Sequence, residues 1–73
     1  MKINKIGKIL NGKDKGYYVE IIHDGVENQN GPYLIVTSAS LDFSIAYDDW
    51  VPDLQGLNQY LAEAGWVIDW DFE

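Results

Sequence analysis

The sequence predicts an α+β domain in which an antiparallel β-meander of four to five strands carries one C-terminal helix. Short segments rich in β-branched and aromatic residues alternate with polar turns that contain glycine, as is typical of antiparallel strands. One later segment has apolar residues at helical spacing, and the segment after it alternates with a period of two. The expected element order is β-β-β-(β)-α-β, in a single domain of residues 1–73.

The helix is expected between Pro52–Asp53 and Gly65. Its apolar residues fall on one stripe, which consists of Leu54, Leu57, Leu61 and Ala64, flanked by Tyr60. Proline suits a first helical turn, and the carboxylate of Asp53 interacts favourably with the helix dipole. Gly65 stands where a left-handed residue ends a helix, so that Trp66 can fold back on Leu61.

A strand is predicted at residues 66–72, directly after the helix. One of its faces holds Trp66, Ile68, Trp70 and Phe72, and the other holds Val67, Asp69, Asp71 and Glu73. Because the aromatic face is large, we expect it to form the core together with Leu57 and Leu61.

The earlier strands are predicted at residues 2–10, 17–23 and 33–37. The isoleucines of the first are out of step, so Gly7 is interpreted as a bulge that resets the register. In the second, Tyr17, Val19 and Ile21 share one face, opposite Tyr18, Glu20 and Ile22. The third is almost continuously apolar, which indicates a central strand covered on both sides. Residues 41–47 alternate as a fourth strand would, although their serines also suit an irregular segment, and residues 24–31 are expected to be a polar loop.

Charge is distributed very unevenly along the chain, which has a net charge of −7. All five lysines lie in the first fifteen residues, and neither Lys nor Arg occurs after Lys15, against eleven carboxylates. Most of the surface is therefore expected to be acidic, which favours a basic partner and disfavours direct binding to nucleic acid. The lysines are interpreted either as a basic arm or as partners of Asp69, Asp71 and Glu73 on neighbouring strands.

Composition excludes several classes of protein. The chain has no cysteine, which excludes disulfides and thiolate metal sites. We find neither a signal peptide nor an apolar run long enough to span a membrane, and therefore expect a cytoplasmic protein. No catalytic, cofactor or metal site is predicted.

Two arrangements of residues are candidates for catalysis. His23 and Asp24 could orient a general base, but none of Ser38, Ser40 and Ser44 lies in a nucleophile-elbow motif. Asp69 and Asp71, at i and i+2, could share a hard cation, yet a solvated acidic face explains them better.

Asp48-Asp49-Trp50 is the motif most suggestive of binding. An aromatic residue beside carboxylates resembles an interface anchor with a charged rim. Alternatively, Trp50 packs over the helix N-terminus while one of the aspartates caps the helix.

The runs Tyr47–Leu54 and Ala64–Trp70 (YDDWVPDL and AGWVIDW) resemble small acidic immunity proteins of bacterial polymorphic toxin systems. The similarity covers roughly the C-terminal third of the chain and rests on aromatic and acidic positions. It implies a protein that acts stoichiometrically by binding a cognate toxin, with no catalytic residue. It nominates Asp48, Asp49 and Trp50 as contact positions.

The leading hypothesis is a non-catalytic inhibitor that binds and occludes a basic partner such as a nuclease toxin, and that is a monomer when free. Its candidate contact residues are Asp42, Asp48, Asp49, Trp50, Asp69 and Asp71. A phage-encoded nucleic-acid mimic, of the anti-restriction or anti-CRISPR type, shares this electrostatic logic and is the closest alternative. A small metal-assisted hydrolase that uses Asp69 and Asp71 is a third reading, and a structural subunit of a larger complex is a fourth.

Overall fold

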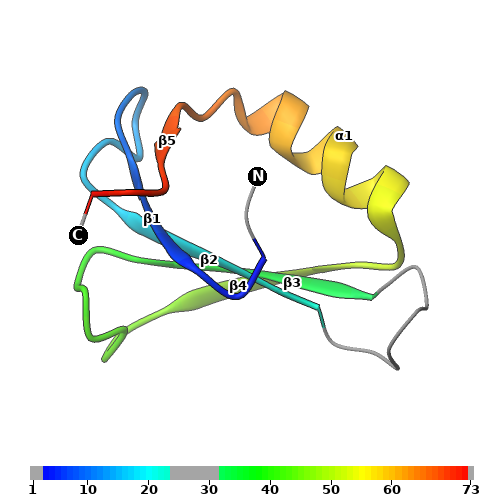
Figure 1. The fold of residues 1–73 in the computed structure, drawn as a ribbon, viewed down its shortest axis with the longest axis horizontal. Coiled ribbons are helices and arrows are strands. Elements are labelled where there is room, and N and C mark those ends of the chain that lie inside the picture. The colour runs from blue at the N-terminus through cyan, green and yellow to red at the C-terminus, as the bar shows by residue number, and fades with distance from the viewer. Residues whose placement is uncertain (1–2, 24–31, 73) are drawn as a thin grey trace.

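The computed structural model describes residues 3–23 and 32–72, and it confirms the α+β class (Figure 1). Five antiparallel strands form one sheet in the order β4-β3-β2-β1-β5, and a single helix follows β4 in the chain. The elements are β1 (Ile6–Ile9), β2 (Tyr18–His23), β3 (Tyr33–Ser38), β4 (Tyr47–Val51), α1 (Leu54–Ala64) and β5 (Ile68–Asp69). The predicted loop at residues 24–31 lies outside the described residues.

The C-terminal end of α1 lies where the sequence predicts it, whereas its first residue is Leu54, so Pro52 precedes the N-cap and does not lie in the first turn. Asp53 is the N-cap, and its Oδ1 accepts a hydrogen bond of 2.7 Å from the backbone N–H of Gly56. Gly65 follows the last helical residue in the left-handed conformation, with φ 66°, and donates its N–H to the carbonyl of Leu61 at 3.0 Å. These two caps limit the helix to eleven residues.

The hydrophobic core lies between α1 and the sheet face below it in Figure 1. Leu57 is the helix residue at its centre and is fully buried. The sheet supplies the rest of the buried cluster, which consists of Ile9, Val19, Ile21, Tyr33, Ile35 and Val51. The predicted core residues Leu61, Trp66, Ile68 and Trp70 pack against this cluster but are only partly buried. They form the wall of the core, while its centre consists of Leu57 and the buried residues of β1 to β4.

The first strand is shorter than the predicted segment 2–10, and Gly7 is not a bulge. Asn4 adopts a left-handed φ of 61°, and its N–H bonds to the carbonyl of Ile21, so the chain turns before the strand begins. Through Gly7 the register with β2 is continuous. A Cβ at Gly7 would lie 2.5 Å from Ile68 and 2.7 Å from Trp70. Glycine is therefore needed here because the C-terminal segment packs directly on the β1 backbone.

The bulge in this hairpin lies at Gly16. The N–H of Gly16 bonds to the carbonyl of Ile9, and the N–H of Ile9 bonds to the carbonyl of Tyr17, each at 2.8 Å. Two residues of one strand therefore oppose one residue of the other. Gly16 has a φ of 92°, which suits the glycine-dependent form of a β-bulge.

Residues 41–47 do not form the predicted strand, and the irregular alternative is correct up to residue 46. The carboxylate of Asp42 accepts hydrogen bonds from the Ser40 hydroxyl at 2.6 Å and the Ser44 N–H at 2.9 Å. Ser38, fully buried, donates its hydroxyl to the carbonyl of Ile45 at 2.6 Å. Such local side-chain bonds compete with the strand ladder, so pairing with β3 begins only at Tyr47.

The strand predicted at residues 66–72 is also shorter, since only Ile68 and Asp69 pair with β1. Asp69 Oδ1 accepts the N–H of Asp71 at 2.9 Å, which turns the chain away from the sheet edge. The Phe72 ring then lies 5.4 Å from the ring of Tyr18, whose side chain points away from the core. Phe72 therefore does not share a face with Trp70, contrary to the prediction.

The two faces of the sheet differ in their cover. On β3, Tyr33 and Ile35 are buried under α1, whereas Leu34 and Val36 on the other side are partly exposed. Within the described residues no helix or strand covers this second face, so the prediction that β3 is covered on both sides is wrong. We call it the open face; its residues are Ile6, Lys8, Tyr18, Glu20, Ile22, Leu34, Val36, Ser38, Asp48 and Trp50, of which Ser38 is buried. Among the described helical residues, no segment is long and apolar enough to cross a membrane.

Leu57→Ala should destabilise the fold by about 2–5 kcal/mol, because it leaves a cavity at the centre of the core. The matched control is Leu54→Ala, on the same helix but 39% exposed, which should cost less than about 1 kcal/mol. Urea unfolding followed by tryptophan fluorescence measures both changes. Equal costs for the two variants would show that Leu57 is not the central contact of the helix.

Candidate protein-binding surface

The candidate motif Asp48-Asp49-Trp50 lies on β4, which is the terminal strand of the sheet. All three residues are exposed, and Trp50 retains 60% of its accessible surface. Their side chains alternate: Asp49 lies opposite buried Ile35 on the α1 side, while Asp48 and Trp50 belong to the open face.

This geometry overturns the capping alternative for the motif. The helix N-terminus is capped by Asp53, and Val51 is the β4 residue that is buried against the core. Trp50 points to the other side of the strand from Val51, so it does not pack over the helix N-terminus. A large aromatic side chain therefore lies exposed on the open face, directly after two aspartates in the chain.

Trp50 continues a row of apolar side chains across the open face. It lies opposite Leu34 of β3, which in turn lies opposite Ile22 of β2. The next row contains Asp48, Val36, Glu20 and Ile6, in that order from β4 to β1. Apolar contact area with carboxylates set within it is a composition suited to binding another protein.

Sequence reasoning missed Ile22, Leu34 and Val36 as surface residues. The signal was present, because the strands at 17–23 and 33–37 have apolar residues on both faces, and only one helix is predicted. One helix covers one face of a sheet, so apolar residues on the second face have to remain exposed or meet a partner.

Asp49 is exposed, and it also has a structural role. Its Oδ2 accepts a hydrogen bond of 2.6 Å from the Tyr60 hydroxyl, which ties β4 to α1. Partial burial raises the pKa of Tyr60 to about 12, and the hydrogen bond and negative charge of Asp49 act in the same direction. Asp49 is therefore held in place, whereas no such tie is found for Asp48 among the described contacts.

The other three candidate aspartates do not lie on the β4 surface. Asp42 organises the 39–46 loop, and its hydrogen bond from the Ser40 hydroxyl, followed by those from Ser44, lowers the pKa of its carboxyl. Asp71 forms an ion pair of 3.2 Å with Lys5, and Asp69 lies opposite Lys8 across β1 and β5. The cross-strand reading of the lysines is thus confirmed for Lys5 and Asp71, while Glu73 lies outside the described residues.

The residues considered for catalysis make other contacts in the described part of the chain. Asp69 uses Oδ1 to hold the Asp71 backbone, and Asp71 uses Oδ1 for Lys5. No group of three or more His, Asp or Glu side chains suited to a metal ion occurs within residues 3–23 and 32–72. His23 stacks on Tyr33 with ring centroids 4.8 Å apart, and its neighbour Asp24 lies outside the described residues.

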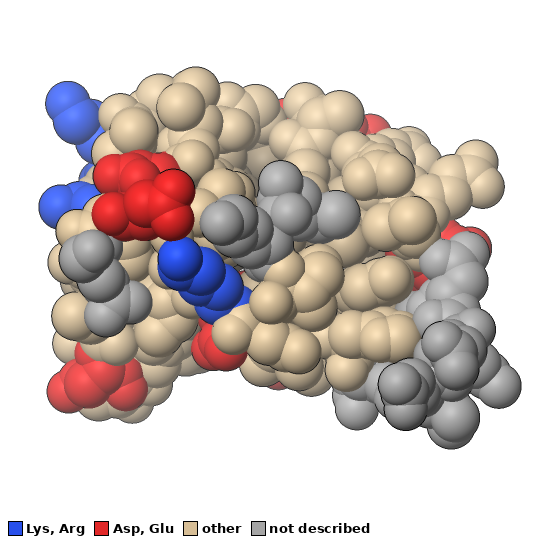
Figure 2. Space-filling view, viewed as in Figure 1, with Lys and Arg blue, Asp and Glu red and all other residues tan. Residues whose placement is uncertain are grey.

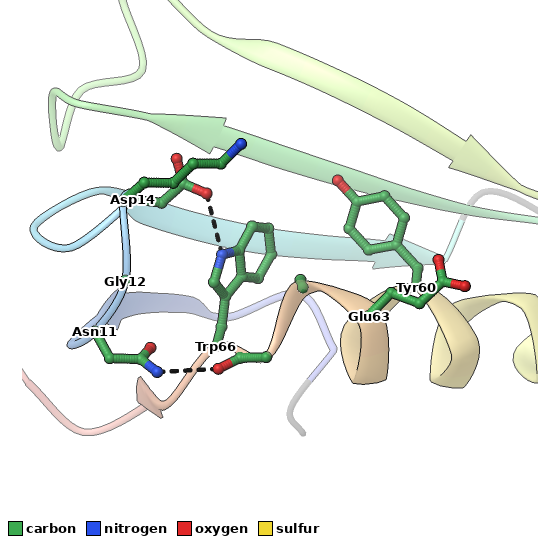
Figure 3. Close-up of a pocket in the computed structure, with 9 residues that line it drawn as sticks. Asn11, Gly12, Asp14, Tyr60, Glu63 and Trp66 are labelled. Atoms are coloured by element: carbon green, nitrogen blue, oxygen red, sulfur yellow. Dashed lines mark hydrogen bonds between the residues drawn. The ribbon is translucent and has the colours of Figure 1, made fainter.

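A pocket of about 350 Å³ lies between the β1–β2 turn and the end of α1 (Figure 3). Trp66 forms one wall, donates its indole N–H to Asp14 at 3.2 Å, and meets the edge of the Tyr60 ring. Asn11 joins the turn to the segment after the helix, since it donates to the Gly65 carbonyl and accepts from the Val67 N–H. These bonds fix the C-terminal segment in place. The residues that line the pocket are therefore explained by their structural role.

The charges of the molecule are segregated in space as well as in sequence. In the view of Figure 2 the visible lysines lie in the left half of the molecule, next to carboxylates. At the far edge of the sheet, β4 carries Asp48 and Asp49 and no basic residue. The surface around Trp50 is therefore acidic and apolar.

Comparisons with protein-family models, with curated proteins and with solved structures found no match to this chain.

Stability should fall as the pH rises from about 10 towards 12, because unfolded Tyr60 ionises near pH 10 and folded Tyr60 near pH 12. The raised pKa stabilises the fold below pH 10, and this contribution is lost as pH passes through the folded value. Tyr60→Phe should show a smaller decline over this range, since the remaining groups titrate alike in both proteins. Urea unfolding at pH 9, 10 and 11 measures the difference, and identical slopes for the two proteins would contradict it.

Proposed function

We propose that this protein is a non-catalytic inhibitor of the immunity type, which binds a basic partner protein through β4 and the adjoining open face. The observation that supports this most is the 60% exposed Trp50, set beside Asp48 and Asp49 on a terminal strand. Aromatic anchors surrounded by polar groups are typical of the residues that dominate binding energy.

Charge supports a basic partner. The chain has a net charge of −7, with no Lys or Arg beyond residue 15. Complementary fields accelerate encounter and disfavour wrong partners. A nuclease toxin is a partner of this kind, because a surface that binds nucleic acid is itself basic. In this proposal the protein acts stoichiometrically in the cytoplasm, as a monomer until it meets its partner.

The nucleic-acid mimic would use the same charge, but Trp50, Leu34 and Ile22 favour a protein partner with an apolar patch. A mimic of phosphate groups needs carboxylates along a surface and has no use for an exposed tryptophan beside two aliphatic residues. The apolar row across the open face is therefore the feature that separates these two hypotheses.

Asp48→Lys should slow association with the partner about tenfold at low salt, because charges at the rim act mainly through the on-rate. The matched control is Glu63→Lys, which changes the net charge equally but lies on α1 away from β4. Trp50→Ala should cost about 2 kcal/mol or more of binding free energy if it is the anchor. The partner is captured with the wild-type protein from cells that express its neighbouring genes, and surface kinetics then follow at several salt concentrations. An acidic partner, or a basic one whose association rate ignores salt, would refute the proposal.

The hydrolase reading makes a different prediction. Titration of the protein with Mg²⁺, Ca²⁺ or Mn²⁺ should give no stoichiometric binding heat, because the Oδ1 atoms of Asp69 and Asp71 already hold protein groups. A micromolar isotherm that Asp69→Asn abolishes would instead support a metal-assisted enzyme.

A further inference from the structure

The free edge of β4 has a defined set of exposed backbone groups. The Ile9 N–H bonds to the Tyr17 carbonyl, so odd-numbered residues of β2 direct their backbone groups to β1 and even-numbered ones to β3. The same alternation holds from β2 to β3 and from β3 to β4. Tyr47, Asp49 and Val51 are therefore the β4 residues whose backbone groups bond to β3. The N–H and C=O groups of Asp48 and Trp50 therefore point outward, away from the sheet.

An exposed edge of this kind normally invites pairing with any extended chain, including a second copy of the protein. Here the side chains restrict what can pair. Two copies that joined antiparallel through β4, in a register centred on Asp48 or on Asp49, would bring that aspartate directly opposite its own copy, and like charges directly opposite are destabilising. The same two carboxylates attract a strand with basic residues at those positions. The edge thus disfavours self-pairing in these registers and favours a basic strand.

We infer that the basic partner of the proposed function binds by adding an extended segment to the free edge of β4, as a sixth strand of the sheet. This inference rests on the proposed function and specifies how the same site is used. Strand addition obtains affinity from backbone hydrogen bonds and specificity from alternate side chains. The four exposed residues Tyr47, Asp48, Asp49 and Trp50 read aromatic–acidic–acidic–aromatic.

This order predicts the sequence of the added segment. Each residue of an added strand lies beside one residue of β4 and on the same face. Basic residues should therefore lie beside Asp48 and Asp49, with apolar residues outside them, beside Tyr47 and Trp50. Because the β4 pattern reads the same in both directions, the predicted segment is apolar–basic–basic–apolar whether it adds parallel or antiparallel.

The probe is the capped peptide Thr-Ile-Lys-Lys-Ile-Thr, with Thr-Lys-Ile-Ile-Lys-Thr as a control of equal composition and charge. The first should bind about tenfold more tightly, since each favourable neighbouring pair contributes a modest amount. Two further versions of the first peptide carry N-methyl groups on every second backbone amide. One version methylates the even-numbered residues and the other the odd-numbered residues. One of them removes the donors that face β4 and should lose binding, while the other should retain it. Equal affinity of the two methylated versions, or of the patterned and control peptides, would refute strand addition.

Amide hydrogen exchange locates the strand. At a peptide concentration ten times Kd, the Asp48 and Trp50 amides should exchange about tenfold more slowly than in the free protein. The Asp49 amide, which bonds to β3, is the internal control and should be protected in both states. Protection at residues 48 and 50 that rises with protein concentration alone would identify a second copy as the occupant, and would overturn the inference.

The same exchange measurement on the native complex separates the two proposals. A captured basic partner that leaves the Asp48 and Trp50 amides unprotected would refute strand addition while the proposed function stands. An acidic partner would refute the proposed function even if the peptide adds to the edge.

Discussion

Packing of a single eleven-residue helix on a five-stranded sheet is the constraint from which the other features of this protein follow. Leu57 enters a buried cluster built by β1, β2, β3 and the end of β4, and Ile3, Trp66 and Trp70 close its sides. The described elements of so short a chain supply no second layer. The apolar residues on the other face of the same strands therefore remain at the surface.

The C-terminal segment is held in place by contacts that are distant in the sequence. Gly7 leaves room for Ile68 and Trp70. In the β1–β2 turn, Asn11 hydrogen-bonds to the backbone that follows the helix, and Asp14 accepts the indole N–H of Trp66. At the opposite end of the sheet, the hydrogen bond between Tyr60 and Asp49 joins α1 to β4. The helix is thereby tied to both ends of the sheet, which holds β4 in a defined position.

The carboxylates of β4 suit both the structure and the binding function that we propose. On a terminal strand, charged side chains discourage pairing between copies, which is a common way to keep a sheet monomeric. The same charges, next to an exposed tryptophan and an apolar row, favour a partner of opposite charge. A purely protective edge would not need the exposed Trp50 and the partly exposed Leu34 and Ile22 beside it, and this combination is why we propose a binding function.

The sequence alone determined the local features of the protein. Helix ends depend on residues that are neighbours in the chain, so Asp53 and Gly65 predict them correctly. The strands at 18–23 and 33–38 follow from their β-branched and aromatic composition. The uneven distribution of charge is also evident from the sequence. The motif Asp48-Asp49-Trp50 could likewise be singled out from its residue types.

Only the tertiary structure decided how far each strand extends and which face is covered. Residues 41–46 alternate like a strand, but Asp42 and Ser38 bind nearby backbone groups instead. Residues 66–72 alternate without interruption, yet β1 offers partners to only two of them, and Asp69 then turns the chain. Gly7 looked like a bulge because the side chains that require it are more than sixty residues away. Alternation reports which side chains share a face, whereas pairing and burial depend on contacts between segments that are distant in the sequence, and local pattern does not encode those contacts.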